Sequence, residues 1–242
     1  MTLTIKNLVG KVGTKTILRG IDFSIEPGEV HAIMGPNGSG KSSFAKTIAG
    51  HPDYEVVSGT VKLGRKNMLI REPHERAREG LFVSFQDPIA VPGIDLGTLL
   101  ASSKKATNGK NLDLISFHDV LETNAAKVGL EKKMLARGVN EGFSGGEKKK
   151  AELLQLITLA PQHAILDEID TGLDIDSLRL TSKIIKDLSN KGTGIIIITH
   201  YKRILEYLQP DVVHVLLNGR IVKSGDHTLA DRVEKYGYKN KF

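Results

Sequence analysis

Apolar and polar residues alternate along the chain with two periods, which together predict an α/β protein. Period-two alternation and short unbroken apolar runs mark strands, and the 3.6-residue period marks helices. We expect strands over residues 3–9, 21–25, 29–34, 82–85, 164–167 and 194–199, and helices over residues 41–49, 112–128 and 175–190. Strands that alternate with helices favour a mostly parallel core, with antiparallel elements near the start and the end of the chain.

The pattern changes between residues 87 and 159, where helical periodicity replaces the strands. We interpret 87–159 as a helical lobe inserted into a single domain, whose α/β core is formed by 1–86 and 160–242. A polar stretch over 102–111 is expected to interrupt the helices of this lobe. Near the end of the chain, Asn218-Gly219 separates two apolar runs and predicts a β-hairpin.

Composition narrows the class of protein. The 242 residues include no cysteine, which excludes disulfides and thiolate metal sites in this chain. The longest aliphatic run, Ile195–Ile198, is far short of the roughly 18 apolar residues of a membrane span. The start of the chain lacks the apolar core of a signal peptide, so we expect a soluble, cytoplasmic protein that does not insert into a membrane. A net charge of +6 would permit contact with nucleic acid or an acidic membrane, but this modest excess is also what a polyphosphate-binding protein needs, so nucleic acid is not an expected partner. The basic segment 232–241 is expected to be a solvated terminus.

A glycine-rich segment supplies the first candidate chemistry. Gly35-Pro-Asn-Gly-Ser-Gly40-Lys41-Ser42 matches the P-loop pattern G-x-x-x-x-G-K-[ST]. Its glycines allow consecutive backbone N–H groups to surround phosphate oxygens, and the helix that follows adds its positive end. Lys41 is expected to reach the β- and γ-phosphates and Ser42 to bind Mg²⁺. The nucleotide-binding residues expected here are Gly35, Pro36, Asn37, Gly38, Ser39, Gly40, Lys41, Ser42 and Ser43.

Two further segments have residues that suit the binding of Mg²⁺, water or an anion beside a nucleotide. Asp167 and Glu168 end an apolar strand, where Asp167 can hold Mg²⁺ and Glu168 can polarise the attacking water. Ser144-Gly-Gly-Glu147 has the spacing of a capping box that starts a helix. A capping box does not need two glycines, which are poor helix formers, so their backbone is expected to approach an anionic ligand.

The order of these motifs strongly resembles the ABC ATPase family over nearly the whole chain. The P-loop is followed by Gln86, the signature Ser144–Glu147, Asp167-Glu168, the loop that ends at Asp174, and His200 after an apolar strand. The resemblance implies a P-loop ABC-type ATPase domain with a RecA-like core, an antiparallel β subdomain and an inserted helical subdomain.

The resemblance also implies roles for these residues. Gln86 would sense Mg²⁺ and water, and His200 would contact the γ-phosphate. Two subunits would enclose two ATP molecules, each held by the P-loop of one subunit and by the signature residues Ser144, Gly145, Gly146 and Glu147 of the other. Asp174 would also belong to the nucleotide-binding residues. Lys41, Glu168 and His200 would be the catalytic residues, and Ser42, Gln86 and Asp167 would surround Mg²⁺.

Two features depart from the family pattern. Val12 stands where many members have an aromatic residue that stacks on adenine, which puts selectivity for the base in doubt. The signature continues as Glu147-Lys-Lys-Lys150 rather than with the commoner glutamine, and these charges fit either a solvated helix face or a special role.

Several segments outside the nucleotide motifs resemble the SufC family, the ATPases of the SUF system of iron–sulfur cluster assembly. They include Phe85–Ile94, Asp170–Asp176, Thr199–Tyr207 and the hairpin Asp211–Asp226. The resemblance implies ATP-driven homodimers that reshape SufB-like and SufD-like scaffold proteins. The partner-facing surface would lie around the loop after Gln86 and the helical lobe, at Asp87–Leu96, unless this loop packs against its own lobe. A nucleotide-binding subunit of an ABC membrane transporter is the alternative, and a nucleic-acid or translation ATPase of the superfamily is a more distant one.

Overall fold

The computed structural model describes residues 1–84, 88–108 and 112–238. Its centre is a six-stranded sheet in which all neighbouring strands run parallel except β11 and β12, which are antiparallel. The strand order is β12 (Arg220–Gly225), β11 (Val212–Leu217), β3 (Val30–Met34), β10 (Gly194–Ile198), β9 (His163–Asp167) and β6 (Leu81–Ser84). The α/β class predicted from the sequence is therefore confirmed, including the hairpin, whose Asn218 and Gly219 both have positive φ.

Both faces of this sheet are covered, which explains its unbroken apolar strands. Along β10, Ile195 and Ile197 pack into one hydrophobic cluster and Ile196 and Ile198 into another. The first cluster lies against α5 (Gly145–Leu159), α6 (Ile175–Asn190), α7 (Arg203–Leu208) and α8 (Thr228–Tyr236). The second cluster includes α1 (Lys41–Ala49) and the second sheet. A strand buried on both faces has no polar side to alternate with.

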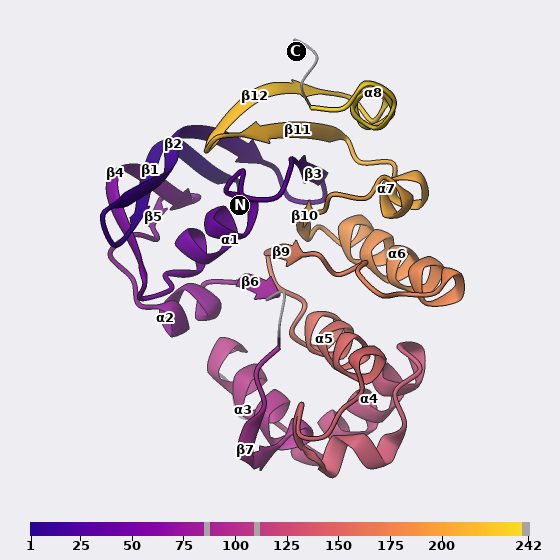
Figure 1. The fold of residues 1–242 in the computed structure, drawn as a ribbon. Coiled ribbons are helices and arrows are strands. Elements are labelled where there is room, and N and C mark those ends of the chain that lie inside the picture. Colours follow the sequence, from indigo (N-terminus) through magenta and orange to yellow (C-terminus); the bar gives the residue numbers. More distant parts are fainter. Residues whose placement is uncertain (85–87, 109–111, 239–242) are drawn as a thin grey trace.

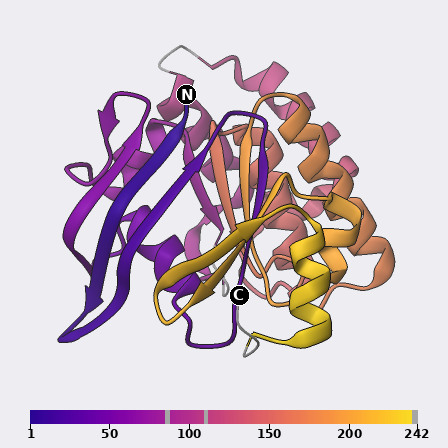
Figure 2. The same ribbon diagram turned by 90° about the horizontal axis from the view of Figure 1, so that it is seen from above.

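The second sheet is antiparallel and lies on the α1 side of the molecule (Figures 1 and 2). Its strands, in order, are β2 (Lys15–Ile25), β1 (Leu3–Val12), β4 (Tyr54–Leu63) and β5 (Lys66–Asn67). β2 begins six residues before the strand expected from the sequence, because residues 15–20 pair with the end of β1. Sequence reasoning missed α2 (Pro73–Arg78), although Glu72, Pro73 and Glu75 form a capping box with proline in the first turn.

Helices fill the chain between β6 and β9 and lie beside the β6 edge of the central sheet (Figure 1). They are α3 (Leu96–Asn108), α4 (Leu114–Lys127), the 3₁₀ helix η1 (Lys132–Ala136) and α5, and a short sheet joins β7 (Val91–Asp95) to β8 (Gly138–Val139). The expected break over 102–111 is wrong for residues 102–108, which continue α3. Buried Leu96 and Leu100 anchor that helix, so its polar second half follows along the surface.

The last helix corrects another expectation. The sequence predicts a solvated terminus from Arg232 onward; Arg232 is exposed as expected, but it lies within α8, which buries Leu229, Ala230 and Val233 on one face. The apolar spacing of these three residues is a helical pattern that the basic residues around them obscure. Within the described residues, no helix has both the length and the apolar character that a membrane span requires.

Candidate active site

The P-loop lies at the edge of the central sheet where the parallel strands end. β3 runs into Gly35, and Gly40 precedes α1 with φ of 108°, a conformation that favours glycine. In this state the side chain of Lys41 turns back, and its Nζ donates to the carbonyl oxygens of Gly35 (2.7 Å) and Pro36 (3.1 Å). Burial lowers the pKa of Lys41, while Glu168 and Asp167 act in the opposite direction. A buried ammonium that donates, among the described residues, to two carbonyl oxygens is a ready partner for phosphate oxygens.

Asp167 lies against the start of α1. Its carboxylate accepts a hydrogen bond from the side chain of Ser42, and burial raises its pKa, opposed first by that hydrogen bond. Oδ1 of this carboxylate is buried and has no hydrogen-bond partner among the described residues. One hydroxyl and one buried carboxylate with a spare oxygen form the hard oxygen donor set that Mg²⁺ prefers. The residues therefore fit the metal expected from the sequence.

Glu168 has a strained backbone and a fixed position. Its φ is 53°, a left-handed conformation that costs a residue with a side chain on the order of 1 to 3 kcal/mol. Its N–H donates to Ile198 O (2.9 Å), and its carbonyl accepts from Thr171 N (3.1 Å) and Lys149 Nζ (2.9 Å). His200 Nδ1 lies 3.2 Å from Glu168 Oε1. The surrounding bonds therefore hold the Glu168 carboxylate beside the imidazole.

These elements enclose a cavity of about 340 Å³, here called the P-loop cavity. Its lining residues are Asn37, Gly38, Gly40, Lys41, Ser42, Ser43, Glu168 and His200. The structure thus brings together the P-loop, the candidate water-polarising carboxylate and the histidine from three separate parts of the chain. Gln86, the remaining candidate near the metal, lies outside the described residues.

The signature segment lies apart from the P-loop cavity. The capping box is formed as predicted: Ser144 N donates to Glu147 Oε2 (2.7 Å), and Glu147 N donates to Ser144 Oγ (3.3 Å). Among the described residues, a Cβ atom added to Gly145 or Gly146 would meet nothing within 4 Å, and neither residue has a positive φ. Neither crowding by the described residues nor backbone conformation therefore requires these two glycines.

A second cavity of about 400 Å³, here called the signature cavity, lies beside these glycines. Lys149, Glu168 and the loop 171–173 also line it. Asp174 is not among its lining residues, because its carboxylate caps α6 by accepting from Ser177 N (2.7 Å). Glu168 is the residue common to both cavities.

Sequence reasoning missed several contacts of the site. The sequence allows Lys149 either a place on a solvated helix face or a special role. In the structure its Nζ donates a hydrogen bond to the Glu168 carbonyl oxygen. The Asn218-Gly219 turn supports the P-loop, because Gly219 N donates to Ser39 O (2.8 Å). Val12 is 36% exposed at the end of β1, next to the turn that leads into β2.

Comparisons with known proteins agree with this geometry. A family model described as "ABC transporter" matches residues 18–171. The Escherichia coli (strain K12) protein named probable ATP-dependent transporter SufC is 48% identical over 240 residues, which cover 98% of this chain and 97% of that protein. A structure titled as the ATP-binding subunit of an ABC transporter has a TM-score of 0.82 at 24% identity, covering 99% of this chain and 95% of the other. A dimeric bacterial ABC transporter cassette has a TM-score of 0.80 at 17% identity, covering 93% and 98%. The two structures share the fold of this chain.

Proposed function

The chain belongs to the ABC transporter family of ATP-binding ATPases, and from that premise we propose that it is the motor subunit of an iron–sulfur cluster assembly machine of the SUF type. ATP binding would join two copies of the chain, and hydrolysis would release them. The work of this cycle would reshape SufB-like and SufD-like scaffold proteins in the cytoplasm. The observation that carries the ATPase part is the P-loop cavity, which gathers Lys41, Glu168 and His200 around one space.

The proposed chemistry assigns one task to each group. Lys41 would leave the carbonyls of the loop and bind the β- and γ-phosphate oxygens. Ser42 and Asp167 would hold Mg²⁺, which supplies positive charge against the phosphates. Glu168 would accept a hydrogen bond from the attacking water, and His200 would donate to the γ-phosphate. Most of the rate enhancement then comes from positioning and electrostatics, as is usual for phosphoryl transfer.

Dimer formation is supported by the position of the signature glycines. Gly145 and Gly146 face open space at the N-terminus of α5, where N–H groups favour an anion. The nucleotide held by the P-loop of a second copy would supply that anion, so each complete site would need both subunits. The dimeric cassette that shares this fold is consistent with such an arrangement.

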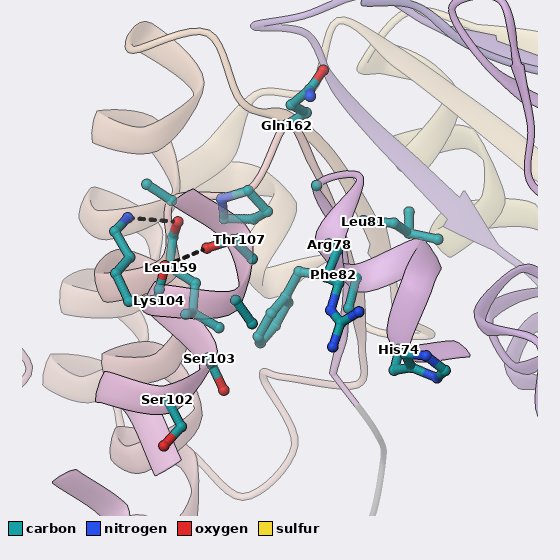
Figure 3. A pocket seen from close by; sticks show the side chains of 15 residues that line it. His74, Arg78, Leu81, Phe82, Ser102, Ser103, Lys104, Thr107, Leu159 and Gln162 are labelled. Carbon is teal, nitrogen blue, oxygen red and sulfur yellow. Dashed lines mark hydrogen bonds between the residues drawn. The ribbon is translucent and has the colours of Figure 1, made fainter. Parts of the chain in front are cut away.

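A groove between the core and the helices offers a docking place for the scaffold. This groove, of about 540 Å³, lies between α2 and β6 on one side and α3 and the end of α5 on the other (Figure 3). Apolar side chains such as Phe82 and Leu159 form part of its lining, and His74, Arg78 and Lys104 add polar and basic groups. No acidic residue occurs among the described residues that line it. The lining therefore suits an apolar segment that carries acidic side chains.

The segment that follows residues 85–87 and leads into β7 extends the same proposal. Ile89 is 81% exposed and Val91 is 44% exposed, although both are large apolar residues. Exposed apolar side chains of this kind are typical of surfaces that contact a partner. The likeness to a protein named SufC supports the proposal of a SUF scaffold as that partner. The word "transporter" in the same name makes a membrane protein the other outcome of the test.

The first experiment uses Glu168→Gln in the full chain. The substitution keeps the shape of the side chain but removes its charge, so we expect ATP binding to persist and phosphate release to fall at least a hundredfold. Purification of the tagged variant from its native host with ATP and Mg²⁺ should then recover a second copy and SufB-like proteins. Unchanged phosphate release would refute the role of Glu168. Recovery of an integral membrane protein would instead assign the chain to transport.

A further inference from the structure

A buried hydrogen bond joins the loops that carry the two candidate catalytic side chains. Thr199, which follows β10 directly, is fully buried, and its hydroxyl donates to Asp170 Oδ2 over 2.9 Å. The same oxygen of Thr199 accepts from Tyr201 N (3.0 Å), so it holds the backbone on the far side of His200 as well. Thr199 N donates to Ile33 O (3.2 Å), which fixes the near side to the central sheet.

Asp170, the acceptor of this bond, also contacts the loop that follows Glu168. It follows Glu168 by two residues, and its carbonyl accepts from Leu173 N (3.3 Å) in the loop that leads to the signature cavity. The residue is 8% exposed, and burial raises the pKa of its carboxyl group, opposed first by the bond from Thr199 and also by the nearby His200 and Lys149. Its Oδ1 is buried without a hydrogen-bond partner among the described residues.

A purely structural bond would not need this carboxylate. Burying a carboxylate costs more free energy than burying a neutral acceptor of similar shape, even where it accepts hydrogen bonds such as those from Thr199 and from its own backbone. The places of Thr199 and Asp170 in the chain indicate a functional role for the bond. His200 follows Thr199 directly, and Glu168 precedes Asp170 by two residues. The bond therefore sets the distance between the loops whose side chains meet at 3.2 Å.

We propose that Asp170 and Thr199 form a clamp that positions His200 against Glu168 and the γ-phosphate during ATP hydrolysis. Neither residue lines the P-loop cavity, so both act as positioning residues rather than by contact with the nucleotide. The proposal rests on the function proposed for His200. It predicts an effect on the chemical step, while the binding of ATP by the P-loop stays as it is.

Two variants test the clamp by removing the hydrogen bond, Thr199→Val and Asp170→Ala. Two conservative variants accompany them: Thr199→Ser keeps the donor hydroxyl, and Asp170→Asn keeps an acceptor oxygen without the charge. We expect kcat to fall between about tenfold and a hundredfold in the first pair, because displacement of a catalytic group by about 1 Å has effects of that size. KM for ATP should stay within about twofold. Thr199→Ser should recover most of the activity, and Asp170→Asn part of it.

Two controls separate positioning from loss of structure. Thr193→Val removes a buried hydroxyl bond of 2.9 Å, to Pro161 O, at the other end of β10, and kcat should be unchanged. Thermal unfolding and the affinity for a fluorescent ATP analogue check that each variant is folded. The decisive readout is Asp170→Ala or Thr199→Val in a His200→Ala background, where we expect no further loss of kcat.

The outcomes distinguish this inference from the proposed function. Equal losses with and without His200 would overturn the clamp, because the bond would then act through something else. Normal turnover in Asp170→Ala and Thr199→Val, with low turnover in His200→Ala, would also overturn it and leave the role of His200 intact. Normal turnover in His200→Ala would refute the proposed role of His200 and the clamp with it.

Discussion

Two buried histidines should make the fold sensitive to mild acid. His31 on β3 and His214 on β11 lie with Nδ1 and Nε2 3.1 Å apart, and both side chains are almost fully buried. His214 Nδ1 also contacts Ser224 Oγ (2.7 Å). Burial, followed by the neighbouring His31, lowers the pKa of His214 to about 4. Burial also lowers the pKa of His31, although Glu29 opposes the effect.

The size and direction of the effect follow from linkage. Above pH 6.5, the ordinary histidine value, neither state binds the proton at His214, and its contribution to stability is fully present. Between 6.5 and about 4 the unfolded chain binds a proton that the folded chain does not, so stability falls as the pH falls. Since one pKa unit corresponds to about 1.4 kcal/mol, His214 alone accounts for a loss of about 3 kcal/mol.

The assay is urea unfolding between pH 7 and pH 4, in the wild type and in His214→Gln. Carboxylates contribute to acid sensitivity in both proteins, so the informative quantity is the difference between the two pH profiles. We expect the wild type to lose about 3 kcal/mol more than the variant over this range. His74→Gln, at an exposed position, should retain the wild-type profile. Parallel profiles for the wild type and His214→Gln would refute the reasoning.

Two other substitutions test elements of the site. Gly146→Ala should leave the fold intact, or stabilise α5 by up to about 1 kcal/mol, because the added methyl group meets open space. Its phosphate release should fall at least tenfold, and normal release would show that the glycine is not approached by a ligand. Arg76→Met removes the buried guanidinium that donates to Thr47 O (3.2 Å) and Ile48 O (2.7 Å) at the end of α1. We expect the free energy of unfolding in urea to fall by about 1 to 3 kcal/mol and ATP to bind more weakly in calorimetry. Arg76→Lys should lie between the wild type and Arg76→Met in both measurements. Wild-type affinity for ATP in Arg76→Met would show that this end of α1 does not affect the nucleotide site.

Features confined to one short segment could be predicted from the sequence. The capping box of Ser144 and Glu147 and the turn at Asn218-Gly219 depend on residues within three positions of each other, and both are present. The order of strands and helices in the core was also recognisable, because strands buried on both faces are unbroken apolar runs. Local chemistry is enough for such elements.

Contacts between distant segments could not be predicted. Arg76 meets α1 from nearly 30 residues away, and Asp170 meets Thr199 from a similar distance, so neither partner is visible in the local pattern. The strained backbone of Glu168 is also a product of tertiary structure, since no local signal favours a left-handed glutamate. The surrounding hydrogen bonds impose it.

The short helix α2 takes part in two surfaces at once. Ala77 and Arg78 line the groove, while Arg76, the residue directly before them, holds the C-terminal end of the P-loop helix. A helix of six residues moves as one body, so a segment that displaces it from the groove side also displaces Arg76. Coupling of this kind is reciprocal: an occupant of the groove that changes the affinity for ATP by some factor has its own affinity changed by ATP by the same factor. The nucleotide level would then govern how tightly a partner binds. The change in either affinity between the absence and the saturation of the other ligand reports the same coupling free energy.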